Sequence, residues 1–188
     1  MRIISGIAKG KKIAIPMDKK TRPLKDRVRE SIFNIIEHSN LFKLKFNQST
    51  VLDLFSGVGS FGLEAISRGA KKVVFIENYK PVIKLLIENI NSLSFNDKSE
   101  IYTKDIYYIK SFEEFNYKFN LIFLDPPFKD ANIKIIIDNL IKSKIADQNT
   151  FVIIHRFKKT IDNFDNNLKI IREEIYGSSK IIFGYFNL

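Results

Sequence analysis

The sequence predicts an α/β fold, a three-layer arrangement built on a seven-stranded, mostly parallel sheet with one antiparallel edge strand. Short apolar runs typical of buried parallel strands alternate with stretches of helical spacing along most of the chain. Near the end of the chain, two runs over 168–175 and 180–186 follow one another across a turn at 176–179, which predicts an antiparallel pair at one edge. A small hairpin and a helix are expected to precede the sheet as an N-terminal extension.

The composition is that of one globular domain. The chain has 188 residues, and 45% of them are apolar, which is enough for a packed core. No run approaches the roughly 18 apolar residues of a membrane span, and the basic start lacks the apolar region of a signal peptide. We therefore expect a cytoplasmic protein without a membrane partner. Nothing in the sequence indicates an oligomer, so a monomer is expected.

The absence of cysteine and the presence of only two histidines limit the possible chemistry. Without cysteine, disulfides, thiolate metal sites and cysteine nucleophiles are all excluded. His38 and His155 are too few for most histidine-based metal sites, so no metal site is expected. Both histidines are interpreted as structural or surface residues.

Basic residues are concentrated near the N-terminus. The net charge is +10, and residues 1–30 hold ten Lys or Arg against three Asp or Glu, which gives ten minus three, or +7. A general lysine bias would spread the charge evenly along the chain. The cluster therefore predicts a polyanion partner, which we interpret as RNA. We expect residues 1–40 to form an RNA-contacting extension and residues 41–188 to form the catalytic domain.

Two elements are expected within this extension. In residues 1–22, Gly6 and Gly10 bracket a turn between short apolar pieces, which predicts a hairpin that presents lysines. Residues 26–38 predict a helix, because apolar residues recur on one stripe and Asp26 lies in the first turn, where a carboxylate suits the helix dipole. The basic residues expected to contact RNA are Lys9, Lys11, Lys12, Arg22, Arg27 and Arg29.

The stretch 50–78 predicts one βαβ unit. A buried strand over 51–54 leads into a glycine turn, a helix and a second strand over 73–76. The glycines let the backbone approach a ligand, and the start of the helix adds unpaired N–H groups. The glycines of the turn are Gly57, Gly59 and Gly62. Their spacing also fits the dinucleotide fingerprint, but Asp53 at the strand end favours a cationic ligand over a pyrophosphate.

Acidic residues end the first four predicted strands. The further strands are predicted over 101–103, 120–124, 150–154, 168–175 and 180–186, with helices from Pro81 and over 132–145. The four acids are Asp53, Glu77, Asp105 and Asp125. Because the carboxyl ends of parallel strands meet at one edge of a sheet, we expect these side chains to open onto one crevice.

Several motifs carry a resemblance to a known family. The tetrapeptide 125–128 (DPPF) together with the glycine turn resembles S-adenosylmethionine-dependent methyltransferases that act on amino nitrogens. The pieces 2–6 (RIISG), 9–10 (KG) and 21–34 (TRP…DRVRE…FN) resemble, in the same order, the bacterial methyltransferases that modify guanine N2 in small-subunit ribosomal RNA. The resemblance spans nearly the whole chain. It implies a Rossmann-like methyltransferase fold, S-adenosyl-L-methionine as cofactor, and small-subunit ribosomal RNA in a partly or fully assembled subunit as partner.

The acids at the strand ends suit this cofactor. Asp53 and the loop after it are expected to contact the methionine end and to favour the positive charge of the sulfonium. Glu77 is expected to accept hydrogen bonds from the ribose hydroxyls, and Asp105 from the adenine amino group, although Asp105 could instead cap a helix. Asn78 departs from the aspartate that some relatives carry there. The predicted cofactor-binding residues are Asp53, Phe55, Ser56, Gly57, Gly59, Glu77, Asn78, Asp105 and Ile106.

The tetrapeptide is predicted to hold the acceptor base. A nucleobase amino group is a poor nucleophile, because its lone pair is delocalised into the ring. The Asp125 carboxylate and the Pro126 carbonyl can accept both of its N–H hydrogen bonds, which favours a pyramidal nitrogen. Pro127 helps to fix the backbone, and Phe128 can stack on the base. Once the base has left its stack, positioning of the amino group and stabilisation of the charge that develops on its nitrogen would accelerate methyl transfer without a metal.

Other functions stay open from the sequence. An adenine-N6 methyltransferase on RNA or DNA would use the same tetrapeptide, which does not choose between amino groups. A non-catalytic RNA-binding assembly factor could keep the same fold, and a nicotinamide dehydrogenase could use the same glycine spacing. Protein glutamine methylation is disfavoured, because that class resembles Asn-Pro-Pro-Tyr, in which an amide replaces the Asp125 carboxylate.

Overall fold

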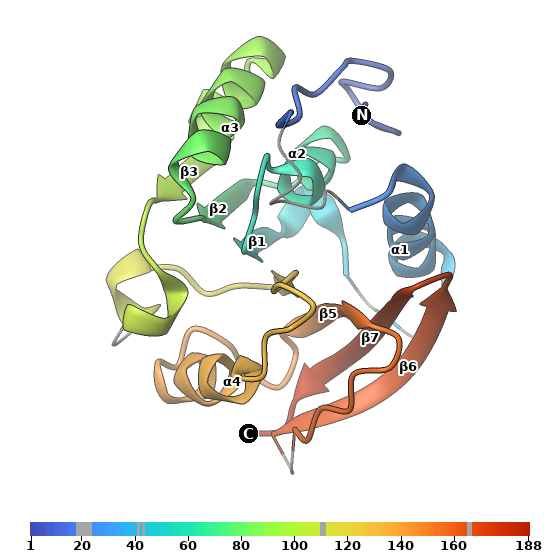
Figure 1. Ribbon diagram of the computed structural model, residues 1–188, viewed down its shortest axis with the longest axis vertical. Coiled ribbons are helices and arrows are strands. Elements are labelled where there is room, and N and C mark those ends of the chain that lie inside the picture. The colour runs from blue at the N-terminus through green and yellow to red at the C-terminus, as the bar shows by residue number, and fades with distance from the viewer. Residues whose placement is uncertain (18–23, 41, 43, 110–111, 165–166) are drawn as a thin grey trace.

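The computed structural model describes residues 1–188 except 18–23, 41, 43, 110–111 and 165–166. A seven-stranded sheet with the strand order β3-β2-β1-β4-β5-β7-β6 forms its centre (Figure 1). The strands are β1 Thr50–Leu54, β2 Lys72–Ile76, β3 Ser99–Tyr102, β4 Leu121–Leu124, β5 Phe151–Phe157, β6 Leu168–Tyr176 and β7 Ser179–Phe186. The α-helices are α1 Asp26–His38, α2 Ser60–Ser67, α3 Lys80–Leu93 and α4 Ile133–Lys142, and the short 3-10 helices are η1 Phe46–Gln48, η2 Asn96–Lys98, η3 Ile106–Tyr108 and η4 Phe112–Phe115. Among the described residues, no helix is long and apolar enough to cross a membrane.

The strand directions confirm the predicted sheet. β1 pairs in parallel with β2 and with β4, and parallel pairing continues from β2 to β3 and from β4 to β5. β7 is antiparallel to both β5 and β6, so the predicted antiparallel pair forms one edge, with β6 outermost. Because the strand order reverses between β1 and β4, their carboxyl ends define the switch point at which α/β sheets bind ligands.

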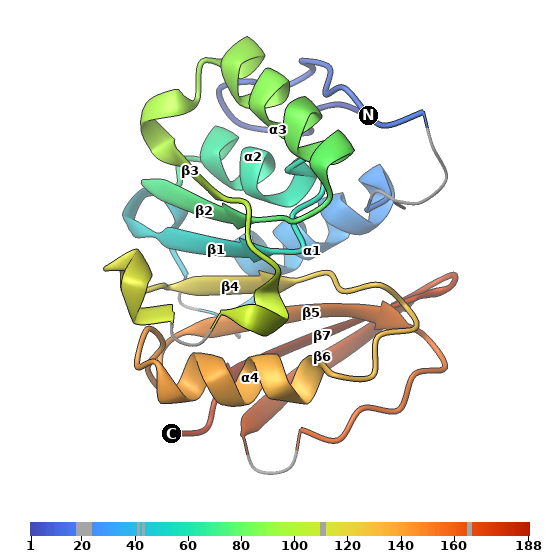
Figure 2. The same ribbon diagram turned by 60° about the vertical axis from the view of Figure 1, so that its left-hand side comes forward.

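Helices cover both faces of the sheet (Figure 2). α1, α2 and α3 pack on the face toward which alternate strand residues such as Val51 and Phe123 point. α4, η3 and η4 pack on the opposite face, against residues such as Leu52 and Leu124. The strands are therefore apolar at successive positions, since a parallel sheet is buried on both sides.

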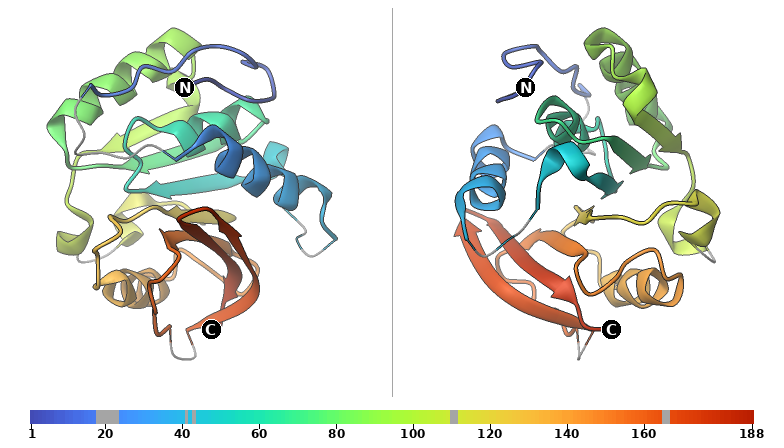
Figure 3. Two further views of the ribbon diagram at one scale, coloured as in Figure 1. Left: turned by 45° about the vertical axis from the view of Figure 1, so that its right-hand side comes forward. Right: turned by 180° about the vertical axis from the view of Figure 1, so that it is seen from behind.

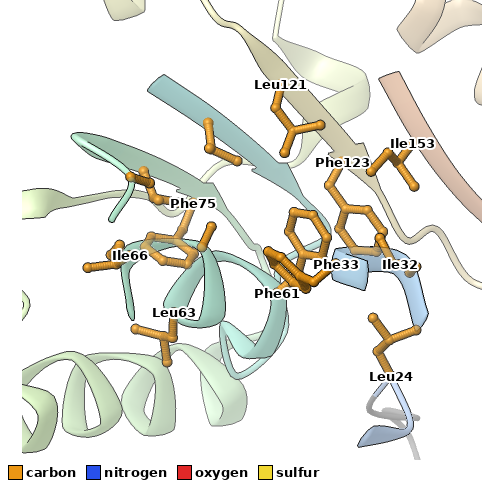
Figure 4. Close-up of a cluster of buried hydrophobic side chains, with 14 of the residues drawn as sticks. Leu24, Ile32, Phe33, Phe61, Leu63, Ile66, Phe75, Leu121, Phe123 and Ile153 are labelled. Atoms are coloured by element: carbon orange, nitrogen blue, oxygen red, sulfur yellow. The ribbon is translucent and has the colours of Figure 1, made fainter. Parts of the chain in front are cut away.

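Aromatic rings hold α1 and α2 against the sheet (Figure 4). The rings of Phe61 in α2 and Phe123 in β4 stack with their centroids 3.9 Å apart, and Phe33 of α1 lies 4.9 Å from Phe61. α2 approaches β2 so closely that a Cβ atom on Gly62 would lie 2.3 Å from the Phe75 ring. Helix–sheet packing therefore requires the third glycine of the turn motif.

The N-terminal segment folds back on itself as the small hairpin that the sequence predicted, with backbone hydrogen bonds between residues 1–3 and 10–13. Gly6 and Gly10 have φ values of 81° and 82°, which supply the predicted turn. An antiparallel bridge joins Arg2 to Lys12. Other N–H groups of the hairpin bond to α2, which keeps the hairpin short.

The N-terminal segment lies beside α2 and α3 (Figure 3), and Glu64 of α2 attaches it to the rest of the domain. Its side chain is fully buried and accepts N–H hydrogen bonds from Ile4 at 2.7 Å and from Ser5 at 3.0 Å. Arg68 donates to the same carboxylate at 2.8 Å, and the Arg29 guanidinium lies 3.9 Å from it. The buried acid is thus balanced by two cations and two N–H groups, as a buried charge requires.

Asn89 of α3 forms a second attachment. Its side-chain amide accepts the N–H of Ala14 at 2.7 Å and donates to the Ala14 carbonyl at 3.1 Å. The same amide group also donates to the Val58 carbonyl at 3.1 Å, in the loop between β1 and α2. One buried side chain therefore joins the N-terminal segment, α3 and the glycine loop.

Residues before position 40 share the core of the rest of the chain. Ile3, Leu24 and Ile32 belong to the same buried cluster as Val73 and Phe123 of the sheet. The division at residue 40 stays a prediction about function, since packing does not separate the two parts.

Candidate active site

A cavity of about 610 Å³ opens at the carboxyl ends of the parallel strands. Its walls come from the loops after β1, β2, β3 and β4, from the end of β5 and from the start of β7. Glu77, Asp105 and Asp125 all line it, so three of the four predicted acids face one crevice. Leu24 and Lys25, just before α1, also line the cavity, a position that the sequence did not predict for them.

The Glu77 carboxylate holds the glycine loop in place. Its Oε2 accepts the N–H of Gly57 at 2.8 Å, and its Oε1 accepts the N–H groups of Asn78 at 2.9 Å and Tyr79 at 2.8 Å. An ionised carboxylate has about four acceptor positions, so roughly one is left for a ligand hydroxyl. The predicted contact of Glu77 with a ribose is compatible with this arrangement and stays a prediction.

Positive φ values shape the loop after β1. They occur at Phe55 (59°), Gly57 (54°) and Gly59 (82°). A Cβ atom on Gly59 would lie 2.4 Å from a methyl carbon of Leu86, so a side chain would clash there. The Ser56 hydroxyl in this loop is buried and has no hydrogen-bond partner among the described residues. Because an unpaired buried hydroxyl costs free energy, Ser56 is suited to bond a polar group of a ligand.

Three predicted cofactor contacts lie behind the cavity wall and do not line it: Asp53, Gly59 and Ile106. The Asp53 carboxylate is buried and accepts the Gly62 N–H at 2.9 Å, so it supports the start of α2. The N–H of Gly59 bonds to the Ser56 carbonyl at 2.8 Å, and the Ile106 side chain packs in the core. A place at the end of a strand does not determine where a side chain points, and the cofactor contacts of these three residues stay predictions.

The environment of Asp53 disfavours its charged form. Burial raises the pKa of the Asp53 carboxyl well above its ordinary value, and the hydrogen bond from Gly62 offsets only part of this. The negative charges of Asp125 and Glu77 raise the pKa further. Asp53 therefore has a folded-state pKa above that of the unfolded chain.

Replacing Asp53 by asparagine is expected to flatten the pH dependence of stability. With a raised folded-state pKa, the stabilisation from protonated Asp53 is complete below the ordinary carboxyl pKa and is lost as the pH rises toward the raised value. Over that range, this group should lower the free energy of unfolding by up to about 1.4 kcal/mol per pH unit. Asparagine does not titrate, yet its oxygen can still accept the Gly62 N–H. Urea unfolding between about pH 5 and pH 8 measures the slopes, and equal slopes for the two proteins would contradict the prediction.

Asp105 is placed for both of the roles that the sequence left open. It lines the cavity, and its Oδ1 also accepts the N–H of Tyr107 at 3.0 Å as the cap of η3. The nearby Asn78 is exposed and lines the cavity as well. Both residues can therefore reach a ligand, and their adenosine contacts stay predictions.

The tetrapeptide 125–128 extends from β4 along the cavity. The N–H of Asp125 donates to the Leu54 carbonyl at 3.2 Å, which keeps the start of the tetrapeptide aligned with β1. The Phe128 ring meets the His155 ring edge-on, with their centroids 5.3 Å apart. All four residues of the tetrapeptide line the cavity, and their catalytic roles stay predictions.

The sequence did not predict His155 as a site residue. Its Nδ1 lies 2.7 Å from Asp125 Oδ1, and its Nε2 lies 2.8 Å from the Ser179 hydroxyl oxygen. The strand predicted over 150–154 extends to Phe157, which brings His155 to the cavity. His155 is therefore not a surface residue, and its burial and two hydrogen bonds are compatible with the predicted structural role. Its place directly after an apolar run was the available signal, since every parallel strand ends at the same crevice.

Tyr107 and Asp130 form a second polar pair that the sequence did not predict. The Tyr107 hydroxyl donates to the Asp130 carboxylate, and both residues line the cavity. Burial and this hydrogen bond raise the pKa of Tyr107, so the phenol remains a donor. Arg156 donates to the Asp130 carbonyl at 2.6 Å and pairs with Asp162 at 2.8 Å. This network joins the loop after β3 to the loop after β4.

The predicted RNA contacts differ in their exposure. The exposed ones are Lys9, Lys11, Lys12 and Arg27. Arg29 is fully buried, where it donates to the Arg2 carbonyl and, at 3.1 Å, to Asp26. The prediction for Arg29 is therefore wrong, because its guanidinium binds the N-terminal segment to α1. Arg22 lies outside the described residues.

Comparison with known proteins gives matches over nearly the whole chain. Residues 1–185 match the family model described as "Conserved hypothetical protein 95". Ribosomal RNA small subunit methyltransferase D of Buchnera aphidicola subsp. Baizongia pistaciae is 35% identical over 156 residues, which cover 83% of this chain and 76% of that protein. The crystal structure of HI0767 from Haemophilus influenzae has a TM-score of 0.76 at 29% identity, covering 100% of this chain and 98% of the other. An RNA methyltransferase from Salinibacter ruber, solved in complex with S-adenosyl-L-homocysteine, shares the fold with a TM-score of 0.63 at 13% identity, over 88% of this chain and 94% of the other.

Proposed function

Because the chain belongs to the family described as Conserved hypothetical protein 95, together with ribosomal RNA small subunit methyltransferase D, we propose that it methylates the N2 amino group of a guanine in small-subunit ribosomal RNA. The methyl donor is S-adenosylmethionine. The observation that carries the proposal is the convergence of Glu77, Asp105 and the Asp125 tetrapeptide on one cavity.

The cavity fits the proposed cofactor. Its volume of about 610 Å³ lies within the range of small-molecule sites. Glu77 would accept from the ribose hydroxyls, Asp105 from the adenine amino group, and the buried Ser56 hydroxyl would gain a partner at the methionine end. When bound, S-adenosylmethionine supplies a methyl group activated by its sulfonium charge. The acids of the cavity favour a cation of this kind. The Salinibacter ruber protein was solved with S-adenosyl-L-homocysteine, the demethylated form of this donor, which supports the assignment.

The tetrapeptide would hold the acceptor. Asp125 Oδ1 faces His155, which leaves Oδ2 and the Pro126 carbonyl to accept the two N–H bonds of the substrate amino group. These bonds draw the nitrogen lone pair out of conjugation and aim it into the cavity. As the new N–C bond forms, the carboxylate stabilises the positive charge on nitrogen and can take the released proton. Phe128, half-buried at the wall, offers a ring face for the flipped base.

Labelled methyl transfer tests the function. Partly assembled and mature small subunits are incubated with tritiated S-adenosylmethionine and the protein, and the RNA is digested to nucleosides. We expect the label in N2-methylguanosine, and none when Asp125→Ala replaces the wild type. Label in N6-methyladenosine would support the adenine alternative. Tight cofactor binding without methyl transfer to any RNA would favour a non-catalytic assembly factor, and binding of a nicotinamide cofactor instead would refute the methyltransferase assignment.

The basic N-terminal segment would bind the phosphates of the RNA. Replacing Lys9, Lys11 and Lys12 by alanine is expected to weaken RNA binding and to reduce the salt dependence of log K by about 0.7 per lost phosphate contact. The matched control replaces three exposed lysines away from the N-terminal segment: Lys134 and Lys142 of α4, which packs on the other face of the sheet, and Lys169 of β6. Fluorescence anisotropy over a salt series measures both quantities. If log K depended equally on the salt concentration in the two triple variants, the N-terminal segment would not be part of the RNA-binding surface.

The proposed working unit is a monomer that acts in the cytoplasm. The small ribosomal subunit, partly or fully assembled, is the proposed partner.

A further inference from the structure

His155 is held between two polar partners at the end of β5. Its Nδ1 lies 2.7 Å from Asp125 Oδ1, and its Nε2 lies 2.8 Å from the Ser179 hydroxyl oxygen. The residue is 5% exposed, and the edge-on Phe128 ring packs against it. Contacts from the tetrapeptide and from β7 therefore fix both the place and the orientation of the imidazole.

These contacts select one tautomer of the neutral ring. An ionised carboxylate is only an acceptor, so the hydrogen between Asp125 and His155 belongs to Nδ1. Nε2 then carries the lone pair, and the Ser179 hydroxyl can donate to it. The Nδ1–H group consequently holds one oxygen of the Asp125 carboxylate and limits rotation of that side chain.

We propose that His155 is a positioning residue for methyl transfer, which fixes the Asp125 carboxylate so that Oδ2 is aimed at the substrate amino group. Ser179 supports this role by keeping the hydrogen of the imidazole on Nδ1. The inference rests on the proposed function, because it takes Asp125 as the acceptor of the amino N–H. It adds two residues that lie outside the tetrapeptide, one on β5 and one at the start of β7. An orienting hydrogen bond of this kind matters because small displacements of a reacting group are costly.

The pattern of exposure indicates which end of the chain of hydrogen bonds is functional. Serine, histidine and aspartate in this order also form the triad of serine hydrolases, in which the aspartate is buried and the serine is the nucleophile. Here the Asp125 side chain is 19% exposed and that of His155 is 7% exposed, while Ser179 is 7% exposed. The Asp125 carboxylate is the most accessible of the three groups. The hydrogen bonds therefore orient Asp125 and do not activate Ser179 as a nucleophile.

Asparagine and glutamine variants separate this role from packing. In His155→Asn the side-chain N–H can take the place of Nδ1, whereas in His155→Gln it lies nearer the place of Nε2. We expect kcat for methyl transfer to small subunits to fall about 100-fold in His155→Gln and by about tenfold or less in His155→Asn. The KM for RNA and the cofactor affinity should stay within about twofold of wild type in both variants, since the lost interaction acts in the transition state. His155→Gln as active as His155→Asn would overturn the proposal.

The matched control is His38→Asn, which changes the exposed histidine at the end of α1 and should leave kcat unchanged. Nitrogen NMR of the wild-type imidazole provides a readout that does not depend on the folding of a variant. We expect the neutral His155 ring to carry its hydrogen on Nδ1. A ring with its hydrogen on Nε2 would overturn the proposal, as would covalent labelling of Ser179 by a fluorophosphonate.

The outcomes distinguish this inference from the proposed function. A wild-type protein that transfers no methyl group to RNA would refute the proposed function, and the positioning role would fall with it. An active wild type with full activity in His155→Gln would refute only the role of His155.

Discussion

Replacing Asp125 by alanine is expected to lower kcat for methyl transfer about 1,000-fold. Asp125 lines the cavity, and one of its oxygens is held by His155, so the other is the charged acceptor available to the substrate amino group. Without it, one amino N–H loses its acceptor and the positive charge that develops on nitrogen is not stabilised. Single-turnover transfer at saturating cofactor isolates this chemical step. The Kd for cofactor, measured by calorimetry, should change far less.

Two further variants make this result specific. Asp125→Asn keeps the shape and one oxygen but loses the charge, so we expect a loss between those of wild type and alanine. Asp97→Ala removes an exposed acid of η2, which precedes β3 and so lies away from the cavity, and it should leave kcat unchanged. An Asp125→Ala protein with kcat close to wild type would show that the carboxylate does not contact the acceptor.

Replacing Glu64 by alanine is expected to lower the free energy of unfolding by about 3–5 kcal/mol. The substitution leaves the Arg29 guanidinium buried without this acid, and it leaves the N–H groups of Ile4 and Ser5 without their acceptor. Arg68 also loses its 2.8 Å partner. Urea unfolding followed by circular dichroism measures the loss. RNA affinity should fall as well, because the lysine-bearing turn is held by this acid.

The control for this variant is Glu88→Ala, which changes an exposed acid on α3 and should alter stability by no more than about 0.5 kcal/mol. Glu64→Gln keeps a hydrogen-bond acceptor for the N-terminal segment, so it should cost less than alanine. A loss below about 1 kcal/mol in Glu64→Ala would mean that the ion cluster does not stabilise the fold.

The sheet could be predicted because buried parallel strands leave a direct pattern in the sequence. The apolar runs over 51–54, 73–76 and 120–124 are observed as β1, β2 and β4 with changes of one residue at their ends. The helix predicted over 26–38 is observed with the same bounds. The N-terminal hairpin was also predicted, from its turn glycines, but its attachment was not, because its N–H groups bond to Glu64 and Ser67 of α2, which lie far along the chain.

The site could be predicted only in part. Parallel strands bring their carboxyl ends together, so the convergence of Glu77, Asp105 and Asp125 followed from the order of elements. The direction of a side chain did not follow, and Asp53 points to the start of α2. The burial of Arg29 depends on Glu64, a partner that no local pattern indicates.

The attachment of the N-terminal segment has a consequence for target choice. Glu64 and Asn89 fix the segment that carries Lys9, Lys11 and Lys12 to the helices on either side of the glycine loop. The distance from these lysines to Asp125 is therefore fixed by the fold. An RNA strand gripped there by its backbone would deliver only the nucleotide at one fixed offset. Selection of the methylated base would then depend more on how the ribosomal RNA is folded than on the nucleotide sequence around that base.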